Sequence, residues 1–161
     1  MNNAARDDRH TLEEVTAEFW DERMAVNLRH QFFAIQAVAP GMRRAGGGSI
    51  VNLSSMSYVS MTSNLSVYQA AKAAVIGMTR GLARDLGVDG IRVNSVMPGW
   101  IMTERQIKLW LNPESEANLM KLQCLKEKLY PPDIARMILW LAADDSRLVT
   151  AQNFVVDGGR N

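Results

Sequence analysis

A chain of 161 residues, 47% of them hydrophobic, is long enough to bury the core of one ordinary domain. It carries 18 Lys and Arg against 17 Asp and Glu, so its charge points neither to nucleic acid nor to an anionic membrane. No apolar run approaches the about 20 residues that span a bilayer, and the first ten residues are too polar for a secretory signal. The single cysteine, Cys124, cannot form an internal disulfide, which favours a reducing compartment. These features indicate a cytoplasmic α/β domain.

The first half of the chain predicts a helix, a strand and a second helix. Thr16 has the residue type of an N-cap, and the apolar residues after it recur at helical spacing until the turn at 46–48 (Trp20, Met24, Leu28, Phe32 and Ile35). Ser49–Leu53 is typical of a short buried strand. A helix from about Ser66 to Leu86 should follow, with one apolar stripe (Ala71, Val75, Met78 and Leu82).

The second half continues the alternation. Ile91–Met97 predicts a strand closed by Pro98 and Gly99, and residues 100–130 predict a long, partly helical excursion. Pro131 and Pro132 open a third helix, and Asn153–Val156 predicts a last strand. This order favours a parallel sheet with helices on its faces.

Tyr68 and Lys72 stand four residues apart in the second predicted helix, so they share one face. An ammonium held beside a phenol would lower the phenol's pKa from its usual value of about 10. Ser55, at the end of the preceding strand, could orient a substrate oxygen. Taken alone, such a pair more often lies on a solvated helix face, so the local pattern leaves both interpretations open.

The wider sequence resembles the short-chain dehydrogenase/reductase family. The motif N-L-S-S, followed after thirteen residues by Y-Q-A-A-K, carries this resemblance together with stretches in matching order: N-N-A at 2–4, V-N-L at 26–28, G-I-R-V-N-S-V at 90–96, P-G-W-I-M-T at 98–103 and V-D-G-G at 156–159. The resemblance implies the C-terminal portion of a doubly wound, Rossmann-type parallel sheet with helices on both faces.

The resemblance also implies roles for individual residues. Tyr68 would be the acid/base, Lys72 would lower its pKa and bind the nicotinamide ribose, and Ser55 would polarise the reacting oxygen. Asn27, in the middle of the first long helix, would hold a water that relays protons to Lys72; without the family it would read as a polar residue on a wet face. The implied cofactor is NAD or NADP, with NAD favoured, and its contacts would be Tyr68 and Lys72 with four further residues (Asn2, Gly99, Ile101 and Thr103).

Further stretches, among them D-D-R-H at 7–10 and R-Q-I-K-L-W at 105–110, resemble the bacterial aldose 1-dehydrogenase branch of that family. This narrower resemblance implies oxidation of an aldose to its lactone, with the excursion from Trp100 to Lys128 shaping the sugar site. The alternative substrate is a 3-oxoacyl thioester or another ketone, reduced in the reverse direction. The family also implies a homo-oligomer, a tetramer or a dimer. Two departures stand near the end, Ala151 for a glycine and Arg160 for a tryptophan, and neither is expected to touch the catalytic set.

The glycine-rich loop that receives the cofactor's pyrophosphate in this family has no counterpart in the sequence. The triplet at 46–48 precedes a strand, whereas a dinucleotide loop follows one, so a surface turn is predicted there. Residues 1–161 are therefore expected to be the C-terminal part of the domain, truncated and inactive alone, and a non-catalytic oligomerising fragment is the alternative of another class. His10 and His30 lack partners at metal-ligand spacing, so no metal site is expected.

Overall fold

The computed structural model describes residues 1–160 and has a three-stranded parallel sheet at its centre. The strands are β1 (Gly48–Leu53), β2 (Ile91–Pro98) and β3 (Asn153–Val156), in that spatial order. Gly48 stands opposite Ile91, and Ser95 stands opposite Asn153. The predicted strands are thus confirmed, with β1 and β2 each one residue longer than expected.

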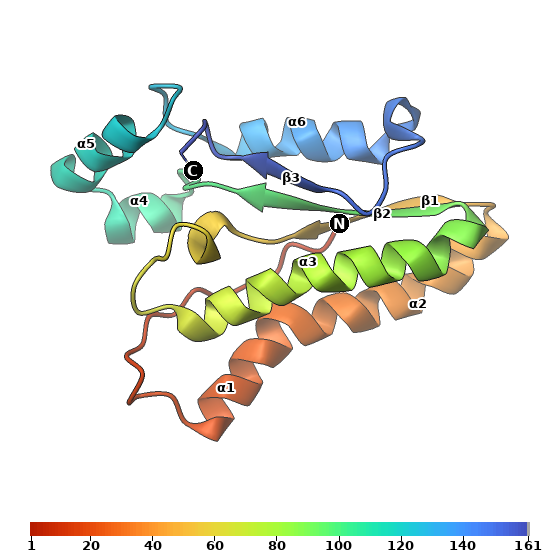
Figure 1. Ribbon diagram of the computed structural model, residues 1–161, viewed down its shortest axis with the longest axis horizontal. Coiled ribbons are helices and arrows are strands. Elements are labelled where there is room, and N and C mark those ends of the chain that lie inside the picture. Colours follow the sequence, from red (N-terminus) through yellow and green to blue (C-terminus); the bar gives the residue numbers. More distant parts are fainter. Residues whose placement is uncertain (161) are drawn as a thin grey trace.

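Helices cover both faces of this sheet, as predicted (Figure 1). Because side chains alternate along a strand, Ile50 packs against α2 (His30–Arg44) and α3 (Ser66–Leu86), and Val51 packs toward α6 (Pro131–Ala142) on the other face. Each face has its own core cluster. The first contains Ile35, Ala39, Ile50, Ala83, Leu86, Ile91 and Val93, and the second contains Val51, Leu53, Val96, Ile134 and Leu141.

The first long helix differs from its prediction. Thr16 caps it as expected, since its hydroxyl accepts from the Phe19 amide at 3.1 Å. However, α1 (Ala17–Met24) is followed by a π-helical segment, Ala25–Arg29, before α2 begins. The wider turn breaks the 3.6-residue period, so of the five apolar residues on the predicted stripe only Ile35 is fully buried.

The helix α3 has the predicted bounds, but the side that it buries is more polar than the sequence pattern indicates. Ala71 and Val75 are buried as expected, whereas Lys72 and Thr79 are buried and Met78 and Leu82 are only partly so. Thr79 accepts a hydrogen bond at 3.0 Å from the side chain of Asn52, which is itself fully buried in β1. Paired polar groups thus allow a polar stripe inside the core.

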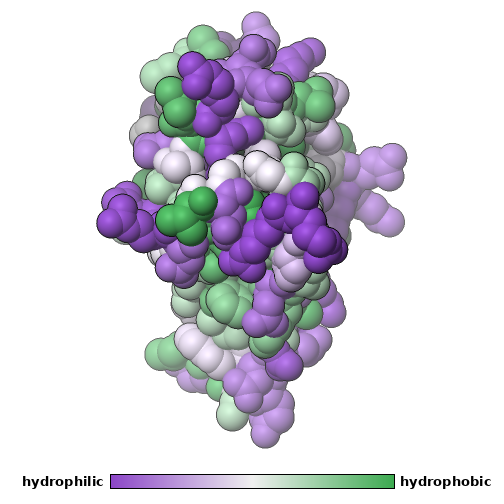
Figure 2. All heavy atoms as spheres, turned by 90° about the vertical axis from the view of Figure 1, so that its right-hand side faces the viewer, coloured by the Kyte–Doolittle hydropathy of each residue, from purple (hydrophilic) through white to green (hydrophobic). Residues whose placement is uncertain are grey.

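The excursion contains two short helices, α4 (Glu104–Trp110) and α5 (Pro113–Leu122), beyond the carboxyl ends of the strands (Figure 1). At the amino ends, the turn predicted at 46–48 ends at Gly47, because Gly48 is already the first residue of β1. Gly47 lies against the turn before β2, where a Cβ on it would meet the Gly90 carbonyl oxygen at 2.9 Å. Figure 2 shows the molecule from the side of the strands' amino ends, where hydrophilic side chains predominate and hydrophobic ones lie between them. None of the helices described combines the length and the apolar character that crossing a bilayer would need.

Ala151, just before β3, has a φ of 60°, in the left-handed region that favours glycine. Its amide donates to the Val93 carbonyl at 2.8 Å, which ties this backbone to β2. The alanine is therefore strained, and the cost falls on stability at the end of the sheet remote from α4 and α5.

Candidate active site

A cleft of about 510 Å³ lies at the carboxyl ends of β1 and β2. Ligands of open parallel sheets bind at this edge, and the volume is typical of small-molecule sites. The walls come from the N-terminal loop, the loops after β1 and β2, α3, α4 and the segment after β3. The lining includes Asn3, Ala5, Asp7, Arg9, Ser54, Ser55, Tyr68, Lys72, Gly99, Trp100, Ile101, Thr103, Arg105, Gln106, Trp110 and Arg160.

Tyr68 and Lys72 project from the first two turns of α3 into this cleft. Lys72 is 1% exposed, and its Nζ donates to the Leu53 carbonyl at the end of β1 at 2.8 Å. The same Nζ lies 5.6 Å from the centroid of the Tyr68 ring. The Ser54 hydroxyl donates to the Lys72 carbonyl at 2.7 Å, which fastens the helix to the strand end. The pair therefore lines the cleft and does not occupy a solvated helix face.

Burial dominates the pKa values of this pair. Burial raises the pKa of Tyr68 to about 12, a hydrogen bond with Ser55 opposes that rise, and the Asp7 carboxylate adds to it. Burial lowers the pKa of Lys72 to about 8. The net shift of the Tyr68 pKa is upward because desolvation of the phenolate dominates. That Lys72 lowers this pKa during the reaction stays a prediction.

Ser55 is the second residue after β1, where its side chain caps the short 3₁₀ turn Met56–Tyr58. Its hydroxyl accepts from the Ser57 amide at 3.1 Å and donates to the Ser57 hydroxyl, also at 3.1 Å. Together with its bond to Tyr68, these contacts fix the serine oxygen beside the phenol. The cleft thus brings Ser55, Tyr68 and Lys72 together, as the sequence predicts.

Asn27 and Asn2 do not line the cleft. Asn27 is fully buried in the π-helical segment, where its carboxamide accepts from the Arg6 amide at 2.8 Å and donates to the Arg6 carbonyl at 3.0 Å. This pair of bonds fastens the N-terminal loop whose residues Asn3, Ala5, Asp7 and Arg9 line the cleft. The reading of Asn27 as a polar residue on a wet face is wrong, and its proton relay stays a prediction.

Asn2 lies beside β1 as a short parallel extension of the sheet. Its amide donates to the Val51 carbonyl at 2.9 Å, its carbonyl accepts from the Leu53 amide at 3.0 Å, and its side chain donates to Asn52 at 2.8 Å. These are structural contacts, and the neighbouring Asn3 lines the cleft. The contact of Asn2 with a cofactor stays a prediction.

Gly99, Ile101 and Thr103 all line the cleft, but each also has a structural task. A Cβ on Gly99 would meet the Asp157 Cβ at 2.7 Å, so close packing explains the glycine. Ile101 forms a parallel bridge with Leu129, and the Thr103 hydroxyl accepts from the Gln106 amide at 3.3 Å as the N-cap of α4. Gly99 and Ile101 are half-buried and Thr103 is exposed, and the Gly99 amide donates to the Val156 carbonyl at 2.9 Å. Their contacts with a cofactor stay a prediction.

Several lining residues had no role in the sequence-based prediction. Asp7 pairs with Arg105 and accepts from the Gln106 side chain at 3.1 Å, and Gln106 in turn accepts from the Trp100 indole at 2.9 Å. No spacing pattern relates residue 7 to residues 100–106, so only the fold could reveal this network. Arg160 lines the same cleft as Tyr68. The expectation that it does not touch the catalytic residues stays a prediction.

The residues present fit the nicotinamide end of a dinucleotide. The buried Lys72 ammonium has formed one hydrogen bond and has further N–H groups on the floor of the cleft, beside the Tyr68 hydroxyl, where ribose hydroxyls could accept. Within residues 1–160 no glycine-rich turn leads from a strand into a helix, so the described residues provide no cradle for a pyrophosphate. In the same residues no cluster of three or more His, Cys, Asp or Glu could hold a metal. His10 instead packs in the core and accepts from the Val67 amide at 3.4 Å.

A family model described as enoyl-(acyl carrier protein) reductase matches residues 1–161. The chain belongs to the short-chain dehydrogenase/reductase family. It is 54% identical over 159 residues to a probable galactose dehydrogenase of Rhizobium meliloti and 49% identical over 159 residues to D-xylose 1-dehydrogenase of Caulobacter vibrioides. Both matches cover 99% of the chain, and they cover 62% and 64% of the relatives, respectively.

The fold agrees with solved structures of the family. A 3-oxoacyl-[acyl-carrier protein] reductase from Brucella melitensis, solved with bound NAD, superimposes with a TM-score of 0.86 at 36% identity. The match covers 98% of this chain and 60% of that one. The chain thus spans somewhat less than two thirds of the length of these relatives.

Proposed function

We propose that this chain carries the catalytic part of an NAD(P)-dependent oxidoreductase that oxidises an aldose at C1 to its lactone. The observation that carries the proposal is the meeting of Ser55, Tyr68 and Lys72 in one cleft at the carboxyl edge of the sheet. The substrate class rests on the names of the two curated relatives, a galactose and a xylose dehydrogenase. NAD is favoured over NADP, in a cytoplasmic enzyme.

In this reaction the C1–H bond breaks as a hydride, the C1 hydroxyl loses its proton, and the C1–O bond becomes the lactone carbonyl. The Ser55 hydroxyl would hold the reacting oxygen, and the deprotonated Tyr68 oxygen would accept the proton. When bound, an oxidised nicotinamide would take the hydride, and its positive charge would lower the pKa of Tyr68.

Other residues would hold the reactants in place. Lys72, anchored on Leu53, would donate to the ribose hydroxyls, and Gly99, Ile101 and Thr103 on the rim would contact the nicotinamide carboxamide. Asn2, beside β1, would lie against the cofactor, and its neighbour Asn3 lines the cleft. Asn27 would hold the N-terminal wall of the cleft and, through a water, pass protons to Lys72.

One observation favours reduction as a second candidate. A Tyr68 hydroxyl whose pKa is raised to about 12 stays protonated at neutral pH, which suits a proton donor to a carbonyl. The name of the NAD-bound neighbour, a 3-oxoacyl-[acyl-carrier protein] reductase, points to a 3-oxoacyl thioester or a related ketone as the substrate.

A third candidate, of another class, is a non-catalytic fragment that assembles with other copies. Trp20, Phe32 and Phe33 on α1 and α2 are 43%, 41% and 51% exposed in this chain. Aromatic side chains exposed to this extent favour a homo-oligomer, a dimer or a tetramer. Sedimentation of the purified chain tests that assembly, and a monomer at all concentrations would contradict it.

Activity is best measured in two proteins: the 161-residue chain, and a chimera in which this chain replaces the matching segment of the galactose dehydrogenase relative. We expect the chimera to reduce NAD with galactose or xylose, faster as the pH rises from neutral, because Tyr68 must lose its proton. Tyr68→Phe should lower that rate by about 10²-fold or more, while the protein still binds the sugar. A chimera that reduces a 3-oxoacyl thioester and oxidises no aldose would establish the second candidate, reduction of a ketone. A folded chimera that is inactive with both substrates would favour the third candidate, a non-catalytic fragment.

A further inference from the structure

The cleft carries more positive than negative charge. Four of its ionisable lining residues are basic, Arg9, Lys72, Arg105 and Arg160, and one, Asp7, is acidic. A neutral aldose needs hydrogen-bond donors and acceptors but has no use for an excess of cationic groups. The excess therefore needs a separate explanation.

Three of the four basic groups are already engaged. Arg105 pairs with Asp7, Arg9 stacks 4.9 Å from the centroid of the Trp110 ring and donates to the Ser63 carbonyl at 3.1 Å, and Lys72 donates to Leu53 at 2.8 Å. For Arg160, no carboxylate among residues 1–160 lies within ion-pair distance.

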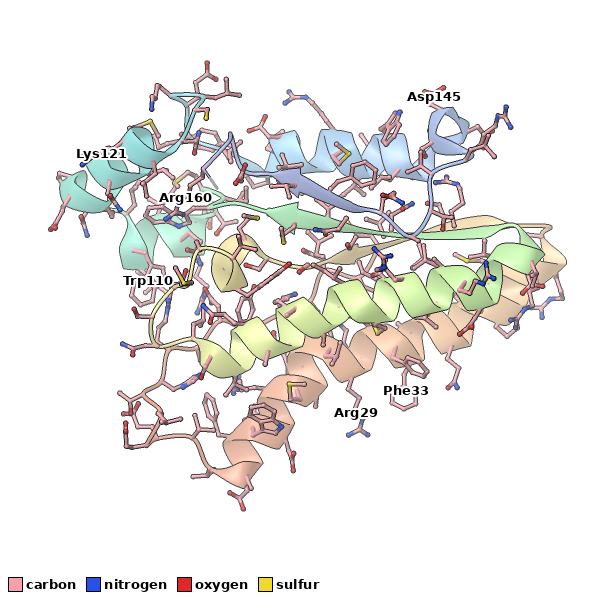
Figure 3. The ribbon with its side chains drawn as sticks, in the orientation of Figure 1. Arg29, Phe33, Trp110, Lys121, Asp145 and Arg160 are labelled. Atoms are coloured by element: carbon pink, nitrogen blue, oxygen red, sulfur yellow. The ribbon has the colours of Figure 1, made fainter. Side chains whose placement is uncertain are left out.

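The backbone that carries Arg160 is fixed. The Gly159 carbonyl accepts from the Cys124 amide at 3.0 Å, and the Gly158 carbonyl accepts from the Leu125 amide at 2.9 Å. The buried Gln123 side chain packs against Gly158 so closely that a Cβ there would meet it at 2.4 Å. Figure 3 shows Arg160 at the end of the sheet where α4 and α5 lie. Arg160 is half-buried and lines the cleft from the wall formed after β3.

We infer that the substrate is a sugar acid and that Arg160 binds its carboxylate. This anionic group would lie at the end of the substrate that is remote from the reacting carbon. A guanidinium presents two parallel N–H donors that match a carboxylate. This inference rests on the proposed function, which places C1 of the sugar beside Ser55 and Tyr68. Because Arg160 comes from a different wall of the cleft, it would contact a carboxylate without touching C1.

The test compares D-galactose with D-galacturonate, which differ only in the group at C6. In the chimera, we expect kcat/KM to be at least tenfold higher for galacturonate. Arg160→Gln should remove that advantage by raising KM for galacturonate, with galactose unchanged, and Arg160→Lys should restore part of it. Arg136→Gln is the matched control, because it neutralises an exposed arginine on α6 outside the cleft. It should change kcat/KM for neither substrate.

Binding to the 161-residue chain, measured by NMR titration, gives a readout that is independent of turnover. Galacturonate should bind more tightly than galactose, and Arg160→Gln should equalise the two. Equal binding by the unaltered chain overturns the inference, whether or not the proposed function holds. Oxidation of galactose alone would likewise overturn it while sustaining the proposed function.

Two further arms separate the sources of the anion. D-Galactose 6-phosphate tests a phosphate in place of the carboxylate, and a preference for it over galacturonate would contradict a sugar acid. If Arg160→Gln raises KM for the nicotinamide cofactor while leaving both sugars unchanged, Arg160 serves the cofactor's phosphates and the inference fails.

Discussion

The floor and the outer wall of the cleft are built in different ways. On the floor, Ser55, Tyr68 and Lys72 are held by bonds between side chains and backbone, such as Lys72 to Leu53 at 2.8 Å and Ser54 to Lys72 at 2.7 Å. On the wall, α4 is held to the N-terminal loop through Arg105 and Asp7, whose side chains are 51% and 19% exposed. Buried bonds to the backbone fix a geometry, whereas exposed ion pairs contribute little free energy. The floor is thus suited to invariant chemistry and the wall to adjustable recognition.

The largest expected effect on stability comes from the floor, at Lys72. Its folded pKa of about 8 lies below the unfolded value near 10.5, so the unfolded chain binds more protons between these values and stability rises with pH in that window. We expect the free energy of unfolding to increase by about 2 kcal/mol from pH 8 to pH 10. Urea unfolding across this range measures it, and Lys72→Met should lack the increase. A parallel pH profile in that variant would show that another group is responsible.

Asn27→Ala tests how the N-terminal loop, which forms part of the cleft wall, is held to the π-helical segment. Losing both hydrogen bonds to Arg6 should destabilise the chain by about 1–2 kcal/mol. Hydrogen exchange of the Arg6 amide should accelerate, while amides in α6 on the opposite face keep their protection. Unchanged exchange at Arg6 would mean that the loop is held by other contacts.

Ala151→Gly gives a change remote from both floor and wall. Glycine adopts a φ of 60° without the steric cost that alanine meets, so stability should rise by about 1 kcal/mol. Thermal unfolding measures the rise. Ala45→Gly, at the end of α2 where φ is −81°, is the matched control and should not stabilise. An Ala151→Gly protein no more stable than the parent would refute the strain.

The smallest effect is expected on the wall. Arg105→Gln removes the exposed pair with Asp7 and should cost only about 0.5 kcal/mol in urea unfolding. High salt should shrink the difference, because exposed charges are screened. A loss of several kcal/mol, insensitive to salt, would show that the wall is as firmly held as the floor.

The sequence was informative wherever a local pattern has one physical meaning. The strand at 153–156 and the bounds of α3 followed from β-rich runs and helical spacing between turn residues. Ser55, Tyr68 and Lys72 followed from their spacing and from the family resemblance, and the structure brings them into one cleft. Gly46 and Gly47 lie in the turn before β1, as their position before a strand required, whereas Gly48 belongs to the strand itself.

Other features depended on contacts between distant segments, which no local pattern encodes. The π-helical segment and the burial of Asn27 depend on the Arg6 backbone, 21 residues away. The polar side of α3 depends on Asn52 in β1. The raised pKa of Tyr68 depends on burial and on the nearby Asp7 carboxylate, and only folding buries the phenol and brings Asp7 close to it.

The sequence by itself therefore determined the order of the main elements and the parallel sheet, because these follow from short-range periodicity. The identity of the three residues on the floor followed from the family resemblance, since the local pattern alone left it open. Only the tertiary structure decided which wall Arg160 joins, which side chains have partners and which way the pKa of Tyr68 shifts. Those properties arise from desolvation and from charges brought together across the fold, and neither can be read along a chain.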